Sequence, residues 1–341
     1  MQSSLRCQYV LFYASYCFRV ESPSFFAVYR YDLAQYPKQI HIKFILFQVP
    51  RHMLIRLFRF LSVFPLPFLH AVGIVLGYLV YALSPTYRRR MRANMALAGY
   101  EQHIGVALRE AGKNIMELPL IWLGRADRLA AKVELENWDI AQQAIDAKQG
   151  VIFLTPHLGC FELSGKSIAL RTKMTVLYRP PRKEALKPLL EDARASSGML
   201  LAPANLSGVR ALAKALKRGE AIGLLPDQVP QQGEGVWAKF FGKPAYTMTL
   251  SAKLHAMTGA PIILTYAERL PFGRGFVQRF VKFEESMDGD PAQQAEAINR
   301  AMEKLIAQVP AQYFWSYHRY KTPDGVAGPD EASNSIDQEQ K

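Results

Sequence analysis

Three short apolar segments constrain the fold of this 341-residue chain more than any other feature. They cover residues 151–155, 174–178 and 221–225, and stretches with the apolar spacing of helices separate them. Strands that alternate with helices form a largely parallel sheet with helices on both faces. A chain of this length can bury one such core. We therefore predict one α/β domain over residues 88–323, with a largely parallel sheet flanked by helices.

Other elements follow from the same patterns of spacing and punctuation. Ser207 is expected to cap a helix that Gly219 closes. The tail over residues 324–341 is acidic and polar, and we expect it to be disordered. Strands are expected over residues 261–267 and 276–283, and helices over residues 102–124, 138–147, 161–170, 184–197, 207–217, 246–257 and 291–307.

An uncharged apolar stretch runs from Phe60 to Leu83, and its length is close to the roughly 20 residues that cross a bilayer. Pro65 and Pro67 limit the expected helix to residues 68–83. Basic residues flank the stretch on both sides, so they define no crossing direction. Either a single span or a helix lying in the inner leaflet fits, and a buried helix of a soluble protein is the alternative. We expect residues 53–87 to attach the protein to the inner membrane, with the main domain facing the cytoplasm.

Residues 1–52 differ from the rest of the chain, since charged residues interrupt their apolar patches. They do not resemble a signal peptide. Met53 begins a segment that reads like a natural start, so we interpret residues 1–52 as a start-site artefact or an extension without assigned function.

Charge and cysteine content narrow the choice of partner and compartment. The chain has 42 Lys and Arg against 29 Asp and Glu, a net charge of +13. This excess favours an anionic membrane surface or a phosphorylated or acidic substrate. Nucleic acid ranks last, because no nucleic-acid-binding signature is present. Three scattered cysteines make neither a disulfide framework nor a metal site, so we expect a reducing compartment and no bound metal.

Polar residues follow each of the three apolar strands. The first strand leads into Thr-Pro-His at residues 155–157, the second into Tyr-Arg-Pro-Pro at 178–181, and the third into Pro-Asp-Gln at 226–228. Ligands of parallel sheets collect at the carboxyl ends of the strands. If these strands are neighbours, His157, Arg179 and Asp227 meet on one edge of the sheet.

His157 and Glu162 form the most suggestive pair. On one continuous helix, five positions would leave their side chains roughly 140° apart. They can meet if His157 lies in the turn after the strand and Glu162 lies in the first helical turn beyond Gly159. Glu162 could then fix the imidazole tautomer while the other ring nitrogen takes a proton from an attacking hydroxyl. A capping glutamate beside a partly buried histidine is the alternative.

Five segments in this order resemble the late (secondary) acyltransferases of lipid A biosynthesis, a branch of the lysophospholipid acyltransferase superfamily. The resemblance runs from about Thr155 to Pro323. The spacing of His157 and Glu162 is shared by that whole superfamily, whereas the YRP, PDQ, FFG and YFW blocks are more specific to this branch. The segments are TPHLGCFELSG, LYRPPRKEALKPLLEDARASSG, GVRALAKALKRGEAIGLLPDQVP, VWAKFFGKPAYT and QYFWSYHRYKTP.

The resemblance implies a glycerolipid acyltransferase-like fold and transfer of a fatty acyl group to a hydroxyl of a lipid A precursor. The acyl donor would be a thioester of acyl carrier protein or coenzyme A, with no further cofactor. His157 would be the general base and Glu162 its orienting partner. Cys160, a candidate nucleophile between them, is better explained as a small apolar filler.

The resemblance also implies substrate-binding residues. Arg179 would bind a phosphate or the developing oxyanion, although it could be an exposed loop arginine. Asp227, with Gln228 beside it, would hold a basic group or serve as a turn residue. Phe240, Phe241 and Gly242 would wall an acyl channel or simply fill the core. Arg319 would lie near the site or the membrane interface.

Two other functions stay open at this point. The chain could acylate another glycolipid, a lysophospholipid or an amino-acid lipid, since many family members carry Asn-Pro after the YRP block, where this chain has Pro181 and Arg182. It could also be a non-catalytic lipid-binding membrane protein, although the intact His157 and Glu162 argue against this.

Overall fold

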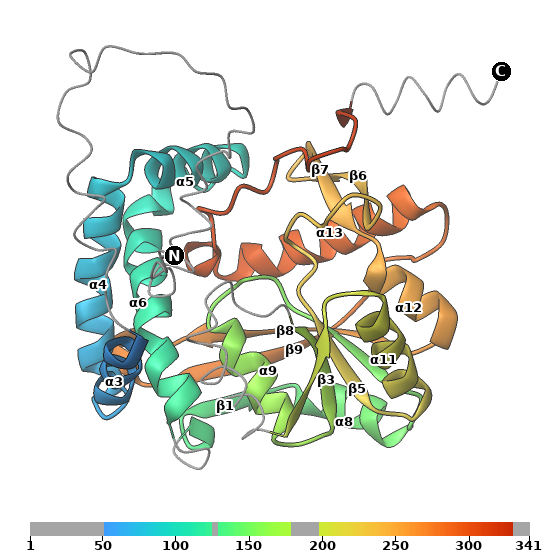
Figure 1. Ribbon diagram of the computed structural model, residues 1–341, viewed down its shortest axis with the longest axis horizontal. Helices are drawn as coiled ribbons and strands as arrows, with labels where there is room; N and C mark the ends of the chain where they lie inside the picture. Colours follow the sequence, from blue (N-terminus) through green and yellow to red (C-terminus); the bar gives the residue numbers. More distant parts are fainter. Residues whose placement is uncertain (1–50, 125–128, 179–197, 330–341) are drawn as a thin grey trace, which may run out of the picture.

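The computed structural model describes residues 51–124, 129–178 and 198–329. Its centre is a seven-stranded sheet with the strand order β1-β9-β8-β2-β5-β3-β4 (Figure 1). Strands β8, β2, β5, β3 and β4 run parallel, whereas β9 is antiparallel to β8 and pairs in parallel with β1. The predicted α/β fold with a largely parallel sheet is confirmed. The strands are β1 (Val133–Glu136), β2 (Val151–Leu154), β3 (Met174–Tyr178), β4 (Met199–Pro203), β5 (Ala221–Leu224), β8 (Ile262–Arg269) and β9 (Phe276–Lys282).

Strand β2 shows how helices cover both faces of this sheet. All four of its residues are buried, which is typical of a central parallel strand. Ile152 and Leu154 pack with residues of α11, α12 and α13. Val151 and Phe153 pack with residues of α8 and α9 on the opposite face. These helices are α8 (Trp138–Asp146), α9 (Phe161–Ala169), α11 (Leu206–Lys217), α12 (Leu250–Thr258) and α13 (Pro291–Gln308).

Four α-helices given below precede the sheet, and two of them, α4 and α6, lie side by side (Figure 1). By length and composition, α4 could cross a bilayer; among the described helices it alone meets that test. It begins at Leu66 rather than at Phe68 as we predicted. The reason is that Pro67 lies in the first turn, where its missing N–H leaves no hydrogen bond unmade. The helices are α3 (Arg51–Leu61), α4 (Leu66–Leu83), α5 (Pro85–Leu97) and α6 (Ile104–Leu123).

Glycines allow the backbones of α4 and α6 to touch. A Cβ atom added to Gly77 would lie 2.1 Å from the carbonyl oxygen of Leu108, and one added to Gly112 would lie 1.8 Å from that of Gly73. Small residues four positions apart, such as Gly73 and Gly77, let two helices approach closely, whether or not they lie in a membrane. Helix α4 is therefore packed against the rest of the protein along one side.

Substitution of Gly77 tests this contact. We expect Gly77→Ala to lower the free energy of unfolding by about 1–3 kcal/mol, because the added methyl group forces the two backbones apart. Gly105→Ala is the matched control in α6, since a Cβ there meets no atom within 4 Å. It should be neutral or stabilising, because alanine favours the helix. Thermal unfolding of both variants in detergent checks the expectation, and equal midpoints would contradict it.

The helix predicted over residues 246–257 is wrong in its first part. Residues 246–248 belong instead to β7 (Lys243–Met248), which forms a separate hairpin with β6 (Gly235–Phe240). Helix α12 starts only at Leu250. The two-residue turn consists of Phe241 and Gly242, both with positive φ angles of 47° and 75°. Such angles match a type I′ turn, whose twist suits a hairpin. An Asn-Gly or Asp-Gly pair would have signalled it more clearly.

One further expectation needs correction, and two strands were missed. Asn205, not Ser207, caps α11, because its side chain accepts hydrogen bonds from the backbone N–H groups of Ser207 and Gly208. Strands β1 and β4 at the two sheet edges were not predicted. Glutamates alternate with apolar residues in β1, whereas β4 is a short apolar run, MLLAP, that we left unassigned. The helix expected over residues 184–197 lies outside the described residues.

Candidate active site

His157 and Asp227 meet at the carboxyl edge of the sheet, as the sequence predicted. Strands β2 and β5 are neighbours, and their carboxyl ends lead into these two residues. The third neighbour, β3, ends at Tyr178. Arg179, the residue expected to join them, lies outside the described residues.

The His157 ring is held from both sides. Its Nδ1 atom lies 2.8 Å from Oδ1 of Asp227, and its backbone N–H donates to Oδ2 of the same carboxylate at 2.9 Å. Its Nε2 atom lies 2.9 Å from the side-chain nitrogen of Gln228. A carboxylate can only accept a hydrogen bond from a ring N–H, so this network assigns the proton to Nδ1. Nε2 is therefore the basic nitrogen of the ring.

The Asp227 carboxyl stays ionised in a buried position. Burial by itself would raise its pKa, but the neighbouring His157, which donates two hydrogen bonds to it, and the charge of Arg319 lower the pKa below its usual value. A buried carboxylate on Nδ1 stabilises the positive charge that forms when Nε2 takes a proton.

Glu162 has a different place from the one we predicted. It does lie in the first turn of α9, where the helix dipole favours a carboxylate. Its Oε2 atom accepts a hydrogen bond from the indole N–H of Trp122 at 3.4 Å. The position on Nδ1 of His157, which we expected Glu162 to take, belongs to Asp227. The pairing of β2 with β5 brings Asp227 next to the imidazole ring of His157. Helix α9 instead places Glu162 beside Trp122 of α6.

Gly159 gives the His157 loop its shape. Its φ angle is 59°, and a Cβ atom there would lie 2.0 Å from the carbonyl oxygen of Ala267. The loop is fastened by two backbone bonds, from Gly159 N–H to the Gln312 oxygen at 3.1 Å and from Cys160 N–H to the Ala267 oxygen at 2.8 Å. Glycine is therefore required at this position by the left-handed conformation and by the close approach of β8.

A buried ionic cluster, which the sequence analysis missed, lies beneath this loop. The Arg269 guanidinium bonds Glu117 through Nε at 2.5 Å and Nη2 at 2.7 Å, and Glu110 through Nη1 at 3.0 Å. Glu117 also lies 2.5 Å from Nε2 of His70 in α4. Arg269 Nη2 is 3.5 Å from the Gly159 carbonyl oxygen. Glu110 and Glu117 lie seven residues apart and therefore on one face of α6, which was the signal for a buried partner.

The remaining features of the cluster concern charge. Burial alone would raise the pKa of Glu117, yet the charge of Arg269 and its bonds with His70 and Arg269 lower it. Burial, together with the negative charge of Glu117, raises the pKa of the Cys160 thiol well above its usual value. A buried neutral thiol is a poor nucleophile, in agreement with the filler role expected for Cys160.

The other predicted residues gather around the β6–β7 hairpin. Phe240 is buried, while Phe241 and Gly242 form the turn. Arg319 is also buried, and its guanidinium donates to the Tyr246 carbonyl oxygen and to Oγ1 of Thr247, both at 2.7 Å. These bonds fasten the hairpin to the segment that carries Arg319. They do not bring Arg319 into hydrogen-bonding contact with His157.

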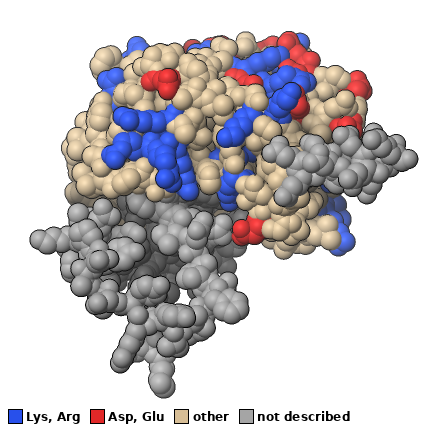
Figure 2. All heavy atoms as spheres, turned by 90° about the horizontal axis from the view of Figure 1, so that it is seen from above, with Lys and Arg blue, Asp and Glu red and all other residues tan. Residues whose placement is uncertain are grey.

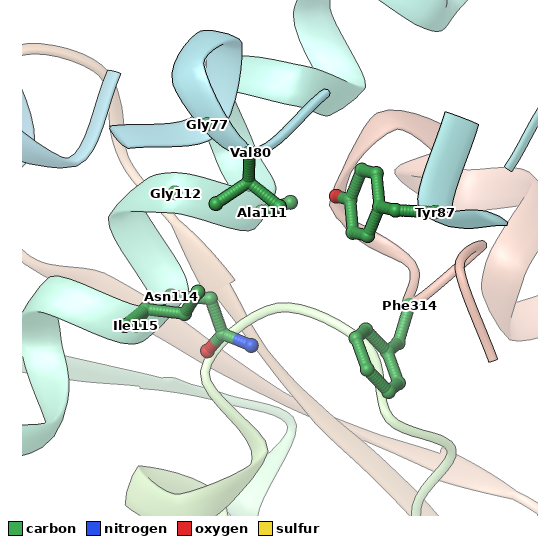
Figure 3. Close-up of a pocket in the computed structure, with 8 residues that line it drawn as sticks. All are labelled: Gly77, Val80, Tyr87, Ala111, Gly112, Asn114, Ile115 and Phe314. Carbon is green, nitrogen blue, oxygen red and sulfur yellow. The ribbon is translucent and has the colours of Figure 1, made fainter. Parts of the chain in front are cut away.

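A small apolar cavity of about 20 Å³, partly open to solvent, adjoins the His157 loop (Figure 3). Val80 and Tyr87 border it on one side and Phe314 on another. The Phe314 backbone N–H donates to the His157 carbonyl oxygen at 3.1 Å, and the two rings lie 6.3 Å apart. The cavity has room for about one water molecule. Among the described residues, no three His, Cys, Asp or Glu side chains gather closely enough to hold a metal ion.

Comparison with known proteins identifies the family of the chain. The chain is 25% identical over 272 residues to the lipid A biosynthesis lauroyltransferase of Escherichia coli K12. This alignment covers 77% of our chain and 88% of the relative. The chain is 26% identical over 270 residues to the lipid A biosynthesis palmitoleoyltransferase of the same organism, covering 76% and 86%. The sequence model of the bacterial lipid A biosynthesis acyltransferases matches residues 43–322. The chain therefore belongs to the bacterial lipid A biosynthesis acyltransferase family.

Proposed function

We propose that this acyltransferase moves a fatty acyl group from a thioester donor to a hydroxyl of a lipid A precursor, with His157 as the general base. The observation that carries the proposal is the His157 ring, held between Asp227 and Gln228 at the edge of the sheet. Membership of the lipid A acyltransferase family supports the reaction class and the acceptor. Acyl carrier protein or coenzyme A would supply the thioester, and no other cofactor would take part.

The geometry suggests a single displacement without an acyl-enzyme. Nε2 of His157 takes the proton of the acceptor hydroxyl while its oxygen attacks the thioester carbonyl carbon. The tetrahedral intermediate then collapses, the carbon–sulfur bond breaks, and the departing thiolate takes the proton from the imidazolium. Asp227 stabilises the imidazolium between the two transfers. Gln228 occupies Nε2 in the free protein, so the acceptor hydroxyl would have to displace its side chain.

We further propose that the protein acts at the cytoplasmic face of the inner membrane. Apolar side chains on α3 and α4 are exposed, among them Phe60, Val75 and Leu79. Arg56 and Arg59 lie on α3 beside them. Exposed apolar surface flanked by cations suits an anionic lipid surface, either with α4 crossing it or lying in it. Thioester donors are cytoplasmic molecules, which favours this face.

Mass spectrometry of lipid A from cells with and without the gene tests the function. Cells without the gene should lack one acyl chain, provided that no redundant enzyme is present. Wild type should restore it, whereas His157→Ala should lower transfer by about 10²-fold or more, as expected for loss of a general base. His103→Ala, in the short helix before α6, is the matched control and should restore the chain fully. An unchanged lipid A would instead favour another lipid acceptor, and an active His157→Ala variant would exclude His157 as the base.

A further inference from the structure

The proposed reaction makes no use of residues 312–317, although this segment contacts both loops that carry the candidate site. Lys and Arg side chains gather across the middle of the face that Figure 2 shows. By contrast, residues 312–317 include no charged side chain, and Tyr313, Trp315 and Tyr317 among them are buried. The segment therefore acts on the site through hydrogen bonds and packing rather than through charge.

The first half of this segment pairs with the His157 loop. The Gln312 carbonyl oxygen accepts a hydrogen bond from Gly159 N–H at 3.1 Å. Phe314 N–H donates to the His157 carbonyl oxygen, also at 3.1 Å. The residues between these two bonds form an antiparallel β-bridge. Because such a ladder fixes the register of its two strands, the backbone of His157 follows the position of the segment.

The Gln312 side chain fastens this short ladder to the central sheet. Its Oε1 atom accepts from the backbone N–H of Arg269 at 2.8 Å, and its Nε2 atom donates to the Arg269 carbonyl oxygen at 3.0 Å. Arg269 is the last residue of β8, and β8 pairs with β2, the strand that leads into His157. A side-chain amide can satisfy a backbone donor and a backbone acceptor at once. Gln312 therefore fixes the position of the ladder relative to the sheet.

The other end of the segment holds the loop that follows β5. The Tyr317 hydroxyl accepts a hydrogen bond from the backbone N–H of Val229 at 2.9 Å. Val229 directly follows Gln228, whose side-chain nitrogen lies 2.9 Å from Nε2 of His157. Tyr317 therefore fixes the backbone beside the residue that occupies the basic nitrogen.

Helix α5 and a local contact hold the segment itself in place. Asn94 of α5 donates from its side-chain amide to the carbonyl oxygens of Trp315, at 2.6 Å, and Tyr317, at 2.8 Å. The Trp315 indole N–H donates to the Pro310 carbonyl oxygen at 2.7 Å. Because the segment is fixed in this way, it provides one common support for the two loops.

We propose that Gln312 and Tyr317 are positioning residues, which align the His157 loop with the loop of Asp227 and Gln228. The inference rests on the proposed function, because the alignment matters only if His157 is the base. A displacement of about 1 Å at a reacting group can lower the rate about 10²-fold. Both side chains bond backbone groups of β8 or of the loop after β5, so they act on the reaction through these elements. Their loss should lower kcat more than it changes KM.

Tyr317→Phe tests the contact with the loop after β5. It keeps the buried ring and removes the hydroxyl that accepts from Val229, so kcat should fall by about 10- to 10²-fold with little change in KM. Tyr320→Phe is the matched control, because the Tyr320 hydroxyl donates to the Phe240 carbonyl oxygen in the β6–β7 hairpin. It should leave kcat unchanged. The measurement is steady-state release of free thiol from an acyl thioester in the presence of a lipid A precursor.

Gln312→Met tests the contact with β8. The variant keeps the length of the side chain but loses both bonds to Arg269, so kcat should again fall by about 10- to 10²-fold. Gln308→Met is the matched control, because Gln308 is exposed and bonds Lys304 of its own helix, α13. If Gln312→Met does not fold, Tyr317→Phe still decides the proposal.

The same changes in a His157→Ala protein separate positioning from a general loss of structure. That protein has no base to align, so Tyr317→Phe and Gln312→Met should lower its residual kcat much less than they lower the wild-type kcat. A general loss of structure would instead reduce both rates by the same factor. Thermal unfolding of each variant verifies that the kinetics compare folded proteins.

Several results would overturn the assignment. Variants with the kcat of their controls, an equal fold-loss of kcat with and without His157, or a raised KM at constant kcat would each exclude a positioning role. A wild-type protein that does not acylate a lipid A precursor, or a fully active His157→Ala protein, would refute the proposed function itself. Activity that depends on His157 but not on Gln312 or Tyr317 would refute only this inference.

Discussion

Asp227→Asn is expected to lower kcat by about 10²- to 10⁴-fold while the fold is retained. The amide can donate a hydrogen bond to Nδ1, which would move the ring proton to Nε2 and remove the basic nitrogen from the acceptor side. It would also leave the imidazolium without a carboxylate partner. The measurement is kcat for release of the free thiol from an acyl thioester in the presence of a lipid A precursor.

Glu162→Gln is the matched comparison for Asp227→Asn. Glu162 accepts a hydrogen bond from the Trp122 indole, whereas the two ring nitrogens of His157 contact Asp227 and Gln228. Glu162→Gln should therefore lower kcat less than Asp227→Asn does. The reverse order would return the orienting role to Glu162. An Asp227→Asn variant with more than half the wild-type kcat would remove Asp227 from the mechanism.

Arg269→Met is expected to lower the free energy of unfolding by about 3–5 kcal/mol, since it leaves Glu117 and Glu110 without their buried cation. Arg279→Met on the adjacent strand β9 is the control. Arg279 pairs with Glu268 at 2.8 Å and also with Glu136, but all three side chains are partly exposed, so its removal should cost only about 1 kcal/mol. Thermal or denaturant unfolding of the two variants gives the comparison.

A double variant separates charge from packing at Arg269. Arg269→Met combined with Glu117→Gln removes the buried charge together with its main partner, so its destabilisation should be less than the sum of the two single changes. Strict additivity would mean that the two residues do not interact energetically. An Arg269→Met protein as stable as Arg279→Met would contradict a buried ionic cluster.

The sequence predicted those parts of the fold that depend on local pattern. Strands β2 and β5 are continuous apolar runs, and α13 has regular apolar spacing, so each was found. Strand β1 is a four-residue edge strand in which glutamates alternate with apolar residues, and its place depends on pairing with β9. The β6–β7 hairpin has a phenylalanine in a left-handed turn position, which no local rule favours.

The same division applies to the candidate site. Spacing along the chain pointed to Glu162 as the partner of His157, because the two lie five residues apart. The partner observed on Nδ1, Asp227, lies 70 residues away and is brought there by the pairing of β2 with β5. The Glu117–Arg269 pair spans 152 residues and depends on how α6 lies against the end of β8, where Arg269 is the last residue. Contacts of this kind require the assembled sheet and cannot be read from one segment.

The close contact of α4 with α6 means that the apolar helix is not an interchangeable module. Its glycines let its backbone contact that of α6 directly. Its His70 is buried against Glu117, which in turn forms an ion pair with Arg269. A shortened chain that begins after Leu83 would therefore not be a smaller, water-soluble version of the enzyme. It would expose the glycine face of α6 to water and remove one side of the cluster that supports the His157 loop.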